Sequence, residues 1–331
     1  DAGIMIKAIG GGGGRGSRQV TDASQVEEAY NRCFSEATNA LKINGLYVEE
    51  FIKRSRHIEV QILGDQQGNI IHLSERECSV QRRFQKLVEV APAPHLADDL
   101  RKDIIEAAMR LAKDVHYSNI GTFEFLVNTT ETGSENRFFF IEVNARLQVE
   151  HTVTEAVTGV DIVQAQIQLA SGSTLTELGL DNSFSLQPRG FAIQARVNME
   201  TLMDDGSVKP SGGTMRSYEA PNGPGVRTDG FGYAGYSTNP AYDSLLAKVI
   251  THSPSAQFEP AVQRSIRALS EFRIEGVETN IPFLQNVLAH ADFTSGQIHT
   301  RRVDENIEHL GKTASTNAPR RWIESRLETT I

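Results

Sequence analysis

The chain has 331 residues, of which 39% are hydrophobic and 23% are charged, a composition typical of an ordinary globular protein. Its formal net charge of −9 argues against a nucleic-acid partner bound on a broad basic surface, but it leaves room for a local positive pocket for phosphates. No apolar run approaches the roughly 18 residues of a membrane span, and the first residues do not form a signal or transit peptide. Cys33 and Cys78 are too few for a disulfide framework, so we expect two buried thiols in a reducing compartment.

The pattern of apolar residues predicts alternating strands and helices. In chain order we expect a strand over 3–8, a helix over 24–41 with Ser24 as its N-cap, a strand over 46–52, a hairpin of strands 58–63 and 69–73, and a helix over 98–116. There follow strands over 121–128 and 137–144, a helix over 160–171, a strand over 190–198, a loop-rich stretch over 219–235, a strand-like segment over 242–252 and a helix over 261–272. The first residues look like the middle of a strand in a longer protein, so we expect the chain to be a fragment.

A run of glycines, Gly10–Gly14, comes directly after the first predicted strand and continues into Arg15 and Gly16. Glycine lets the backbone approach a ligand closely and turn its N–H groups onto phosphate oxygens. The run lacks the Gly-Lys-Ser/Thr ending of a Walker A loop and the spacers of a dinucleotide fingerprint. With Lys7 before it and Arg15 within it, the run favours a mobile lid over phosphates; a flexible linker is the alternative.

The segment Glu75–Lys86 is dense in charge. A solvated loop is the default interpretation of such a run. Gln81 and Lys86, however, stand just before an apolar, proline-bearing stretch over 88–94, where Lys86 would bind an anion as a point charge. The composition of the segment does not decide between the two interpretations.

Glu124 and Glu142 lie on two strands that flank a polar loop over 129–136. If these strands pair as a hairpin centred on Gly133, the two carboxylates face each other, and like charges in that position repel unless a cation lies between them. With Asn144 they make an oxygen-rich set suited to Mg²⁺. Two solvated glutamates on an edge strand are the alternative, and a register shift of two residues remains open.

The most informative segment is Phe140–His151, in which an apolar strand runs into polar residues spaced two apart: Glu142, Asn144, Arg146, Gln148 and Glu150. On an extended backbone these side chains share one face, so we expect them to project together. Arg146 offers a clamp for an anion and Glu150 a candidate general base, with a structural salt bridge as the alternative. Structural roles are the simpler expectation for His57, His72 and His151, and a surface position or an ion pair is the simpler expectation for Arg196.

Taken in order, these segments resemble the biotin carboxylase family of the ATP-grasp superfamily. The resemblance runs from the first residue to at least Asn280 and rests on Ile6–Gly16, Arg56–Gln61, Cys78–Arg83 with Gln85 and Lys86, Gly121–Phe125, Phe140–His151, Asp161–Val163 and Tyr242–Leu246. It implies an α+β, ATP-grasp fold, in which a lid subdomain joins a larger antiparallel-sheet domain, followed by a biotin carboxylase C-terminal region. The implied divisions are a lid over 1–52, a catalytic core over 53–186, the C-terminal region over 187–311, and a tail over 312–331 that is helical or disordered.

The resemblance also implies a role for each candidate residue. ATP would be held by Lys7, Gly12, Gly13, Gly14, His57 and Gln81, with Glu49, Glu50 and Ile52 along the adenine site. Mg²⁺ or Mn²⁺ would be bound by Glu124 and Glu142, with Asn144 nearby. Lys86, Arg146, Gln148 and Val149 would form the bicarbonate pocket. Glu150 would deprotonate bicarbonate, and Arg196 would stabilise the enolate of biotin.

The implied reaction is the ATP-dependent carboxylation of biotin, through carboxyphosphate, by a ligase. Its implied partners are bicarbonate, a biotinyl carrier domain and a carboxyltransferase, in a homo-oligomeric parent of the cytoplasm or an organelle matrix. In two respects the chain departs from the family. Phe84 stands where many members carry a nucleotide-contacting histidine, and the family's N-terminal domain, with a further ATP-contacting lysine, would precede Lys7. A carbamoyl-phosphate-synthetase-like ligase and a catalytically silent docking domain are the alternatives.

Overall fold

The computed structural model describes residues 3–9, 16–42, 45–129, 137–181, 187–203, 207–239 and 241–311, apart from the side chains of residues 40 and 41. The predicted glycine lid, with Gly12, Gly13 and Gly14, lies outside the described residues, and so does the tail over 312–331. Within the described part of the chain, no helix is long and apolar enough to cross a membrane.

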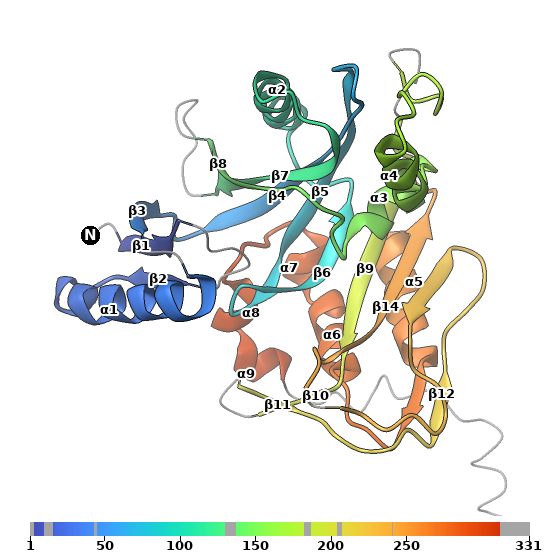
Figure 1. Cartoon of the computed structure of the whole chain (residues 1–331). Helices are drawn as coiled ribbons and strands as arrows, with labels where there is room; N and C mark the ends of the chain where they lie inside the picture. Colours follow the sequence, from blue (N-terminus) through green and yellow to red (C-terminus); the bar gives the residue numbers. More distant parts are fainter. Residues whose placement is uncertain are drawn as a thin grey trace, which may run out of the picture.

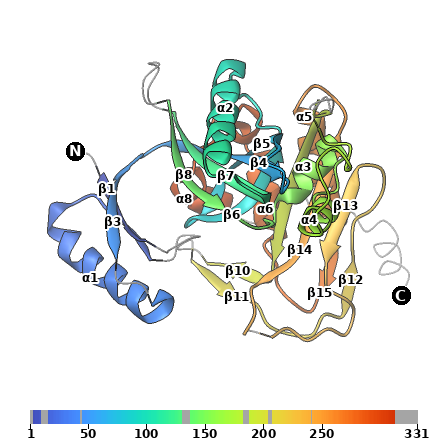
Figure 2. The ribbon, with the colours of Figure 1, turned by 45° about the horizontal axis from the view of Figure 1, so that its top comes forward.

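A small antiparallel sheet with the order β2-β1-β3 begins the molecule. It consists of β1 (Gly3–Ala8), β2 (Ser17–Val20) and β3 (Leu46–Phe51), and α1 (Val26–Glu36) packs on it between a 3₁₀ turn, η1 (Ala23–Gln25), and a π turn, η2 (Ala37–Leu41). Ile6, Val20 and Cys33 form its core. Figure 2 shows this unit to one side of the main body. The predicted cap is wrong: the Asp22 carboxylate accepts the backbone N–H of Ser24 at 2.9 Å, so Asp22 begins the helical segment.

The main body is built on an eight-stranded antiparallel sheet with the order β13-β14-β9-β6-β5-β4-β7-β8 (Figure 1). Its strands are β4 (Ser55–Gly64), β5 (Ile70–Arg82), β6 (Gln85–Ala91), β7 (Asn119–Asn128), β8 (Phe138–Asn144), β9 (Phe191–Asn198), β13 (Val226–Gly230) and β14 (Leu245–Ser253). Two short pairs lie outside it, β10 (Glu200–Leu202) with β11 (Val208–Pro210) and β12 (Ser217–Glu219) with β15 (Arg273–Glu275). The α+β class expected from the sequence is confirmed.

The helix α2 (Asp98–Asp114) covers one face of β4 and β7, and the polar residues of these strands lie on the other face. Ile58, Val60 and Phe123 pack under α2 in one apolar cluster. Because side chains alternate along a strand, His57, Glu59 and Glu124 project from the opposite face. The alternation of β4 and β7 thus separates a hydrophobic core from a polar site. The helix expected over 98–116 ends at Asp114, and Val115 is exposed.

Helices cover both faces of the other half of the sheet. The helices α3 (His151–Thr158) and α4 (Ile162–Ala170) follow β8, and Val153 of α3 packs on Ala192. The next residue of β9, Ile193, points to the other face of the sheet, which packs on α5 (Glu259–Glu271) and α6 (Ile281–Ala289). Three one-turn helices complete this end: α7 (Ala291–Thr294), α8 (Arg302–Glu305) and α9 (Ile307–Leu310).

The β7–β8 hairpin has the expected register at the two glutamates. Glu124 lies opposite Glu142 and Thr122 opposite Asn144. A bulge between Glu124 and Phe125 then shifts the pairing by one residue toward the loop. The strand expected over 137–144 is confirmed as β8, which ends at Asn144, whereas the extended backbone assumed for the polar residues after it is wrong. The carbonyl oxygen of Gln148 lies 2.6 Å from Nδ1 of His151, in the turn that starts α3.

The charged segment is not a solvated loop: every residue of 75–82 is buried within β5. The charges are tolerated because each has an opposite partner, and a buried charge is costly unless it is paired. Glu75 contacts Arg101 at 2.8 Å, and the Arg82 guanidinium forms a bidentate pair with the Glu200 carboxylate at 2.9 and 3.1 Å. The free thiols Cys33 and Cys78 are buried, as expected.

Candidate active site

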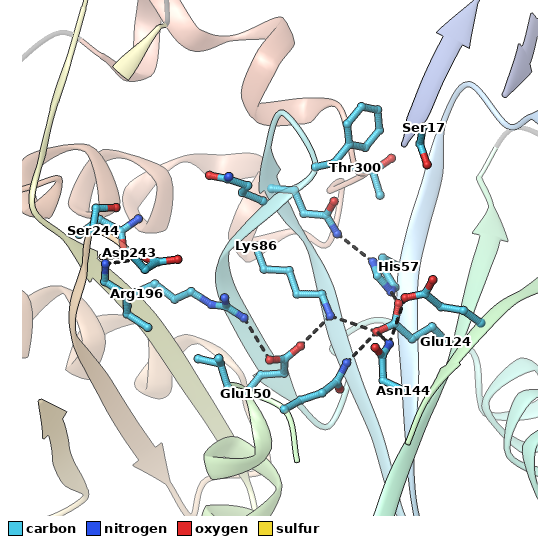
Figure 3. Close-up of a pocket in the computed structure, with 18 of the residues that line it drawn as sticks. Ser17, His57, Lys86, Glu124, Asn144, Glu150, Arg196, Asp243, Ser244 and Thr300 are labelled. Atoms are coloured by element: carbon cyan, nitrogen blue, oxygen red, sulfur yellow. Dashed lines mark hydrogen bonds and ion pairs between the residues drawn. The ribbon is translucent and has the colours of Figure 1, made fainter. Parts of the chain in front are cut away.

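A cavity of about 860 Å³ lies between the small sheet and the large sheet, with walls from both. All of the predicted site residues that the structure describes line it: Lys7, Glu49, Glu50, Ile52, His57, Gln81, Lys86, Glu124, Glu142, Asn144, Arg146, Gln148, Val149, Glu150 and Arg196. Figure 3 shows many of these side chains pointing toward one another across the cavity. The strand face opposite α2 supplies one wall, and the turn after β8 supplies the floor.

Glu124 of β7 and Glu142 of β8 face each other across the ladder, with Asn144 between them. The Asn144 amide nitrogen donates to Oε1 of Glu124 at 2.9 Å and to Oε1 of Glu142 at 3.1 Å. One donor group thus bridges two carboxylates that would otherwise repel. A divalent cation fits the same place, because it would meet carboxylate oxygens of the kind that Mg²⁺ prefers.

Glu124 is the most heavily contacted carboxylate of this group. His57 Nε2 lies 3.0 Å from its Oε2, and the Gln148 amide donates to its Oε1 at 2.8 Å. Burial raises the pKa of Glu124, but the charge and hydrogen bond of His57, together with Lys86, outweigh burial and hold it far below its usual range. Conversely, burial lowers the pKa of His57, and the Glu124 carboxylate overcomes this and raises it. Each of the two groups therefore favours the charged form of the other.

Gln81 completes the wall on the other side of His57. Its amide nitrogen lies 2.8 Å from Nδ1 of His57 and donates to the carbonyl oxygen of Cys78 at 2.7 Å. The imidazole is thus held at both ring nitrogens, and the backbone N–H of His57 donates to the Ser79 hydroxyl at 2.7 Å. His57 thus combines the structural role expected of a lone histidine with a place on the cavity wall.

Lys86 lies between the Glu124 side of the cavity and Glu150. Its ammonium pairs with Glu59, lies 2.6 Å from Oε1 of Glu150 and 3.4 Å from Oε1 of Glu124. Burial lowers the pKa of Lys86, but Glu59 and the other carboxylates raise it well above its usual value. The ammonium is therefore a fixed positive charge at the centre of the site.

Glu150 is held between two cations. Its Oε1 faces Lys86, and its Oε2 accepts from Arg196 Nη2 at 3.0 Å; the residue is 2% exposed. Burial and the nearby Glu59 carboxylate raise the pKa of Glu150, but Lys86 and Arg196 outweigh them and lower it below its usual value of 4.5. Arg196 is itself anchored by the buried Glu89, whose Oε1 accepts from Nε at 2.5 Å. The carboxylate is thus ionised at neutral pH.

The turn between β8 and α3 presents Arg146, Gln148 and Val149 to the cavity. Arg146 donates to the Asn144 side-chain oxygen at 3.1 Å and is exposed. The Val149 carbonyl oxygen is fixed by the ammonium of Lys248 at 3.0 Å. The five polar residues from Glu142 to Glu150 therefore converge on one space, although they do so through a turn and not along one strand.

The small sheet supplies the opposite wall. Lys7 pairs with Glu49 across the β1–β3 ladder, and Glu50 and Ile52 line the same side. Phe84 also lines the cavity, at the turn between β5 and β6, with its side chain 53% exposed and a left-handed φ of 65°. An apolar ring thus occupies the wall at the position for which the resemblance implied a histidine in many relatives.

Several residues of the site were not predicted. Glu59, Glu89 and Arg76 lie behind the cavity and hold its cations or amides. A signal for Glu59 was present in the alternation of Arg56–Gln61, which puts it on the same strand face as His57. The far wall is formed by residues 210–213, 238–239 and 242–245. Of these, only 242–245 stood in a segment of the resemblance, and no role was assigned to them.

Comparison with protein families defines the class. Residues 2–178, more than half of the chain, match the carbamoyl-phosphate synthase L chain, ATP binding domain, and residues 194–305 match the biotin carboxylase C-terminal domain. The chain belongs to the biotin carboxylase family of the ATP-grasp superfamily, and the fold expected from the resemblance is confirmed.

Among known proteins, the chain is similar to pyruvate carboxylase of Aspergillus niger, with 47% identity over 95% of the chain and 26% of the relative. It is 50% identical to pyruvate carboxylase 1 of Caenorhabditis elegans, over 92% of the chain and 25% of the relative. The chain thus spans about a quarter of the length of these proteins.

Solved structures show the same fold. The biotin carboxylase domain of 2-oxoglutarate carboxylase from Hydrogenobacter thermophilus, a dimer in complex with MgADP, ADP and bicarbonate, matches with a TM-score of 0.84 and 39% identity, over 94% of this chain and 66% of that one. Pyruvate carboxylase of Rhizobium etli matches with a TM-score of 0.86 and 40% identity, over 93% of this chain and 27% of that one.

Proposed function

We propose that this chain catalyses the ATP-dependent carboxylation of biotin by bicarbonate, the first half-reaction of a biotin-dependent carboxylase. The observation that carries the proposal is the buried Glu150 carboxylate, held between Lys86 and Arg196 on the wall of the cavity. A carboxylate kept ionised beside two cations suits a base for an anionic substrate, because the cations attract the anion that the base must deprotonate.

In the proposed reaction, Glu150 takes the proton of bicarbonate, and a bicarbonate oxygen attacks the γ-phosphorus of ATP to give carboxyphosphate and ADP. Lys86, Arg146 and the Gln148 amide would hold the anion in place for this attack. Carboxyphosphate would break down to carbon dioxide and phosphate, and the phosphate would remove the ureido proton of biotin. Arg196 would stabilise the enolate, which takes up the carbon dioxide.

The nucleotide would lie between the two sheets. Lys7, His57 and Gln81 would contact ATP, Glu49, Glu50 and Ile52 would line the adenine site, and the glycine run with Gly12, Gly13 and Gly14 would close over the phosphates. Glu124 and Glu142, with Asn144 nearby, would hold Mg²⁺ or Mn²⁺, which neutralises the charge of the phosphates. Closure of the lid would keep water from the labile intermediate.

For the whole protein we propose a carboxylase of the pyruvate carboxylase type, since the similar curated proteins of fungi, animals and bacteria carry that name. A biotinyl carrier domain and a carboxyltransferase would be its partners, in a homo-oligomer. A cytoplasmic location, or an organelle matrix in a eukaryote, accords with relatives from bacteria and with the mouse enzyme named as mitochondrial. The lid, core and C-terminal divisions expected from the sequence are part of this proposal.

The substitution Glu150→Gln tests the proposal, because it keeps the shape of the side chain and removes the proton acceptor. We expect bicarbonate- and biotin-dependent ATP cleavage by the full-length protein to fall by about a hundredfold or more, with nucleotide binding retained. Glu200→Gln is the matched control, since it alters a buried, ion-paired glutamate outside the cavity. Normal turnover in Glu150→Gln would remove Glu150 as the base.

A further inference from the structure

A buried arginine behind the cavity joins the metal side of the site to the base. Arg76 of β5 is 0% exposed and is not among the residues that line the cavity. Its guanidinium makes six contacts at 2.9–3.3 Å, with oxygens of Glu59, Gln61, Thr122, Gln148 and Thr154. These partners come from β4, β7, the turn after β8 and α3, so one side chain fixes four parts of the fold.

The first link runs through Gln148. Arg76 Nη2 donates to the side-chain oxygen of Gln148 at 2.9 Å, while the Gln148 amide nitrogen donates to Glu124 at 2.8 Å. A reversed amide would turn its N–H groups toward a guanidinium, which has no acceptor, and its oxygen toward a carboxylate. Arg76 therefore determines which end of the Gln148 amide faces the cavity.

The second link runs through Glu59. Arg76 Nε and Nη2 contact Oε2 of Glu59 at 3.3 and 3.2 Å, and the other oxygen of Glu59 pairs with Lys86. Lys86 in turn contacts Glu150 at 2.6 Å. With Glu59 at 0% exposure, solvent cannot replace Arg76, and the position of the Lys86 ammonium depends on this buried pair.

We propose that Arg76 is a positioning residue of the bicarbonate subsite: it orients Gln148 and Glu59, and through them it places the amide and the ammonium that receive the anion. This inference rests on the proposed function. It assigns Arg76 no contact with ATP, and Glu124 keeps its contacts with His57 and Asn144 when Gln148 is misplaced. The effect of losing Arg76 should therefore fall on bicarbonate and not on the nucleotide.

The test compares Arg76→Lys with the unaltered full-length protein. Lysine keeps a charge near Glu59 but lacks the planar fork that reaches five side chains at once. We expect the KM for bicarbonate to rise by about tenfold or more, with the KM for ATP changed less than about twofold. Arg76→Met, which also removes the charge, should raise the KM for bicarbonate further.

Arg82→Met is the matched control, because Arg82 lies on the same strand, is also buried and pairs with Glu200 outside the cavity. It should lower the thermal stability like the Arg76 variants and leave the KM for bicarbonate unchanged. Thr154→Val removes a single contact of Arg76 and serves if the larger changes prevent folding; it should raise the same KM by about threefold.

An unchanged KM for bicarbonate in Arg76→Lys, or a parallel rise of both KM values, would overturn the inference. If the Arg76 variants do not fold, an unchanged value in Thr154→Val has the same meaning. The proposed function fails separately, if the unaltered protein shows no bicarbonate-dependent cleavage of ATP at all.

Discussion

The two oxygens of Glu150 are divided between Lys86 and Arg196, so the carboxylate that we propose as the base is also a structural element. A buried carboxylate between two cations stabilises the fold only while it is ionised. The same contacts that prepare Glu150 for proton transfer should therefore be visible in the stability of the protein.

We expect Glu150→Gln to lower the free energy of unfolding by about 2 kcal/mol at neutral pH. Because the folded state lowers the pKa of Glu150 below 4.5, its contribution is complete above that pH and is lost as the pH falls through the lowered value. The difference between Glu150→Gln and the unaltered protein should therefore shrink on acidification below pH 4.5, in urea unfolding followed at several pH values.

Glu28→Gln provides the control for this measurement, since the Glu28–Arg32 pair is exposed and worth little. It should change the unfolding free energy by less than about 0.5 kcal/mol at every pH. A Glu150→Gln difference that stays constant through the acid range would show that the ionised carboxylate contributes nothing to the fold.

Among single residues, the sequence predicted those that line the cavity better than the buried residues that hold them in place. The pairing of Glu124 with Glu142 followed from strand alternation, and the structure confirms the register. Glu59, Glu89 and Arg76 were missed because their partners lie far away in the chain, and no local pattern shows which strands bring them together.

The turn between β8 and α3 is the element on which the site depends most. It carries Arg146, Gln148, Val149 and Glu150, and the Lys248 ammonium of β14 holds it through the Val149 carbonyl oxygen at 3.0 Å. Lys248 also lies 3.5 Å from Asp229 of β13. A strand of the C-terminal half thus fixes a loop of the other half.

We expect Lys248→Met to reduce kcat/KM for bicarbonate by about tenfold, because the Val149 carbonyl oxygen loses its contact with the Lys248 ammonium. Steady-state kinetics at varied bicarbonate would measure this. Asp229→Asn removes the other partner of Lys248 and should leave kcat/KM near its normal value; equal losses in both variants would mean that the ion pair, and not the Val149 contact, matters.

The elements themselves were predicted unevenly. Alternation and helical spacing located β1, β3, β4, α2, β7 and β8 within a few residues. The charged strand β5 remained ambiguous, because the composition of a segment does not reveal the opposite charges that other strands bring to it. The extended backbone assumed for Phe140–His151 ends at Asn144, where the chain turns toward α3. Polar residues at every second position can line a cavity from a turn as well as from a strand.

For the whole molecule, the arrangement of two sheets explains why the site needs residues from most of the chain. The small sheet contributes Lys7, Glu49 and Glu50, the large sheet Lys86, Glu124 and Arg196, and loops near Asp243 close the far side. Of the two helices on which the second half of the sheet packs, α5 was predicted and α6 was not, and sequence spacing did not give the strand order.

The central claim is that bicarbonate itself, and not water, attacks ATP in this cavity. The most direct test supplies the full-length protein with ATP, biotin and bicarbonate labelled with ¹⁸O, and measures the label in the phosphate released. If carboxyphosphate forms, the bridging oxygen stays on phosphorus when carbon dioxide leaves, so label should pass from bicarbonate to phosphate, with the amount of phosphate dependent on biotin. Phosphate without bicarbonate-derived label, released at the same rate whether or not biotin is present, would contradict the account.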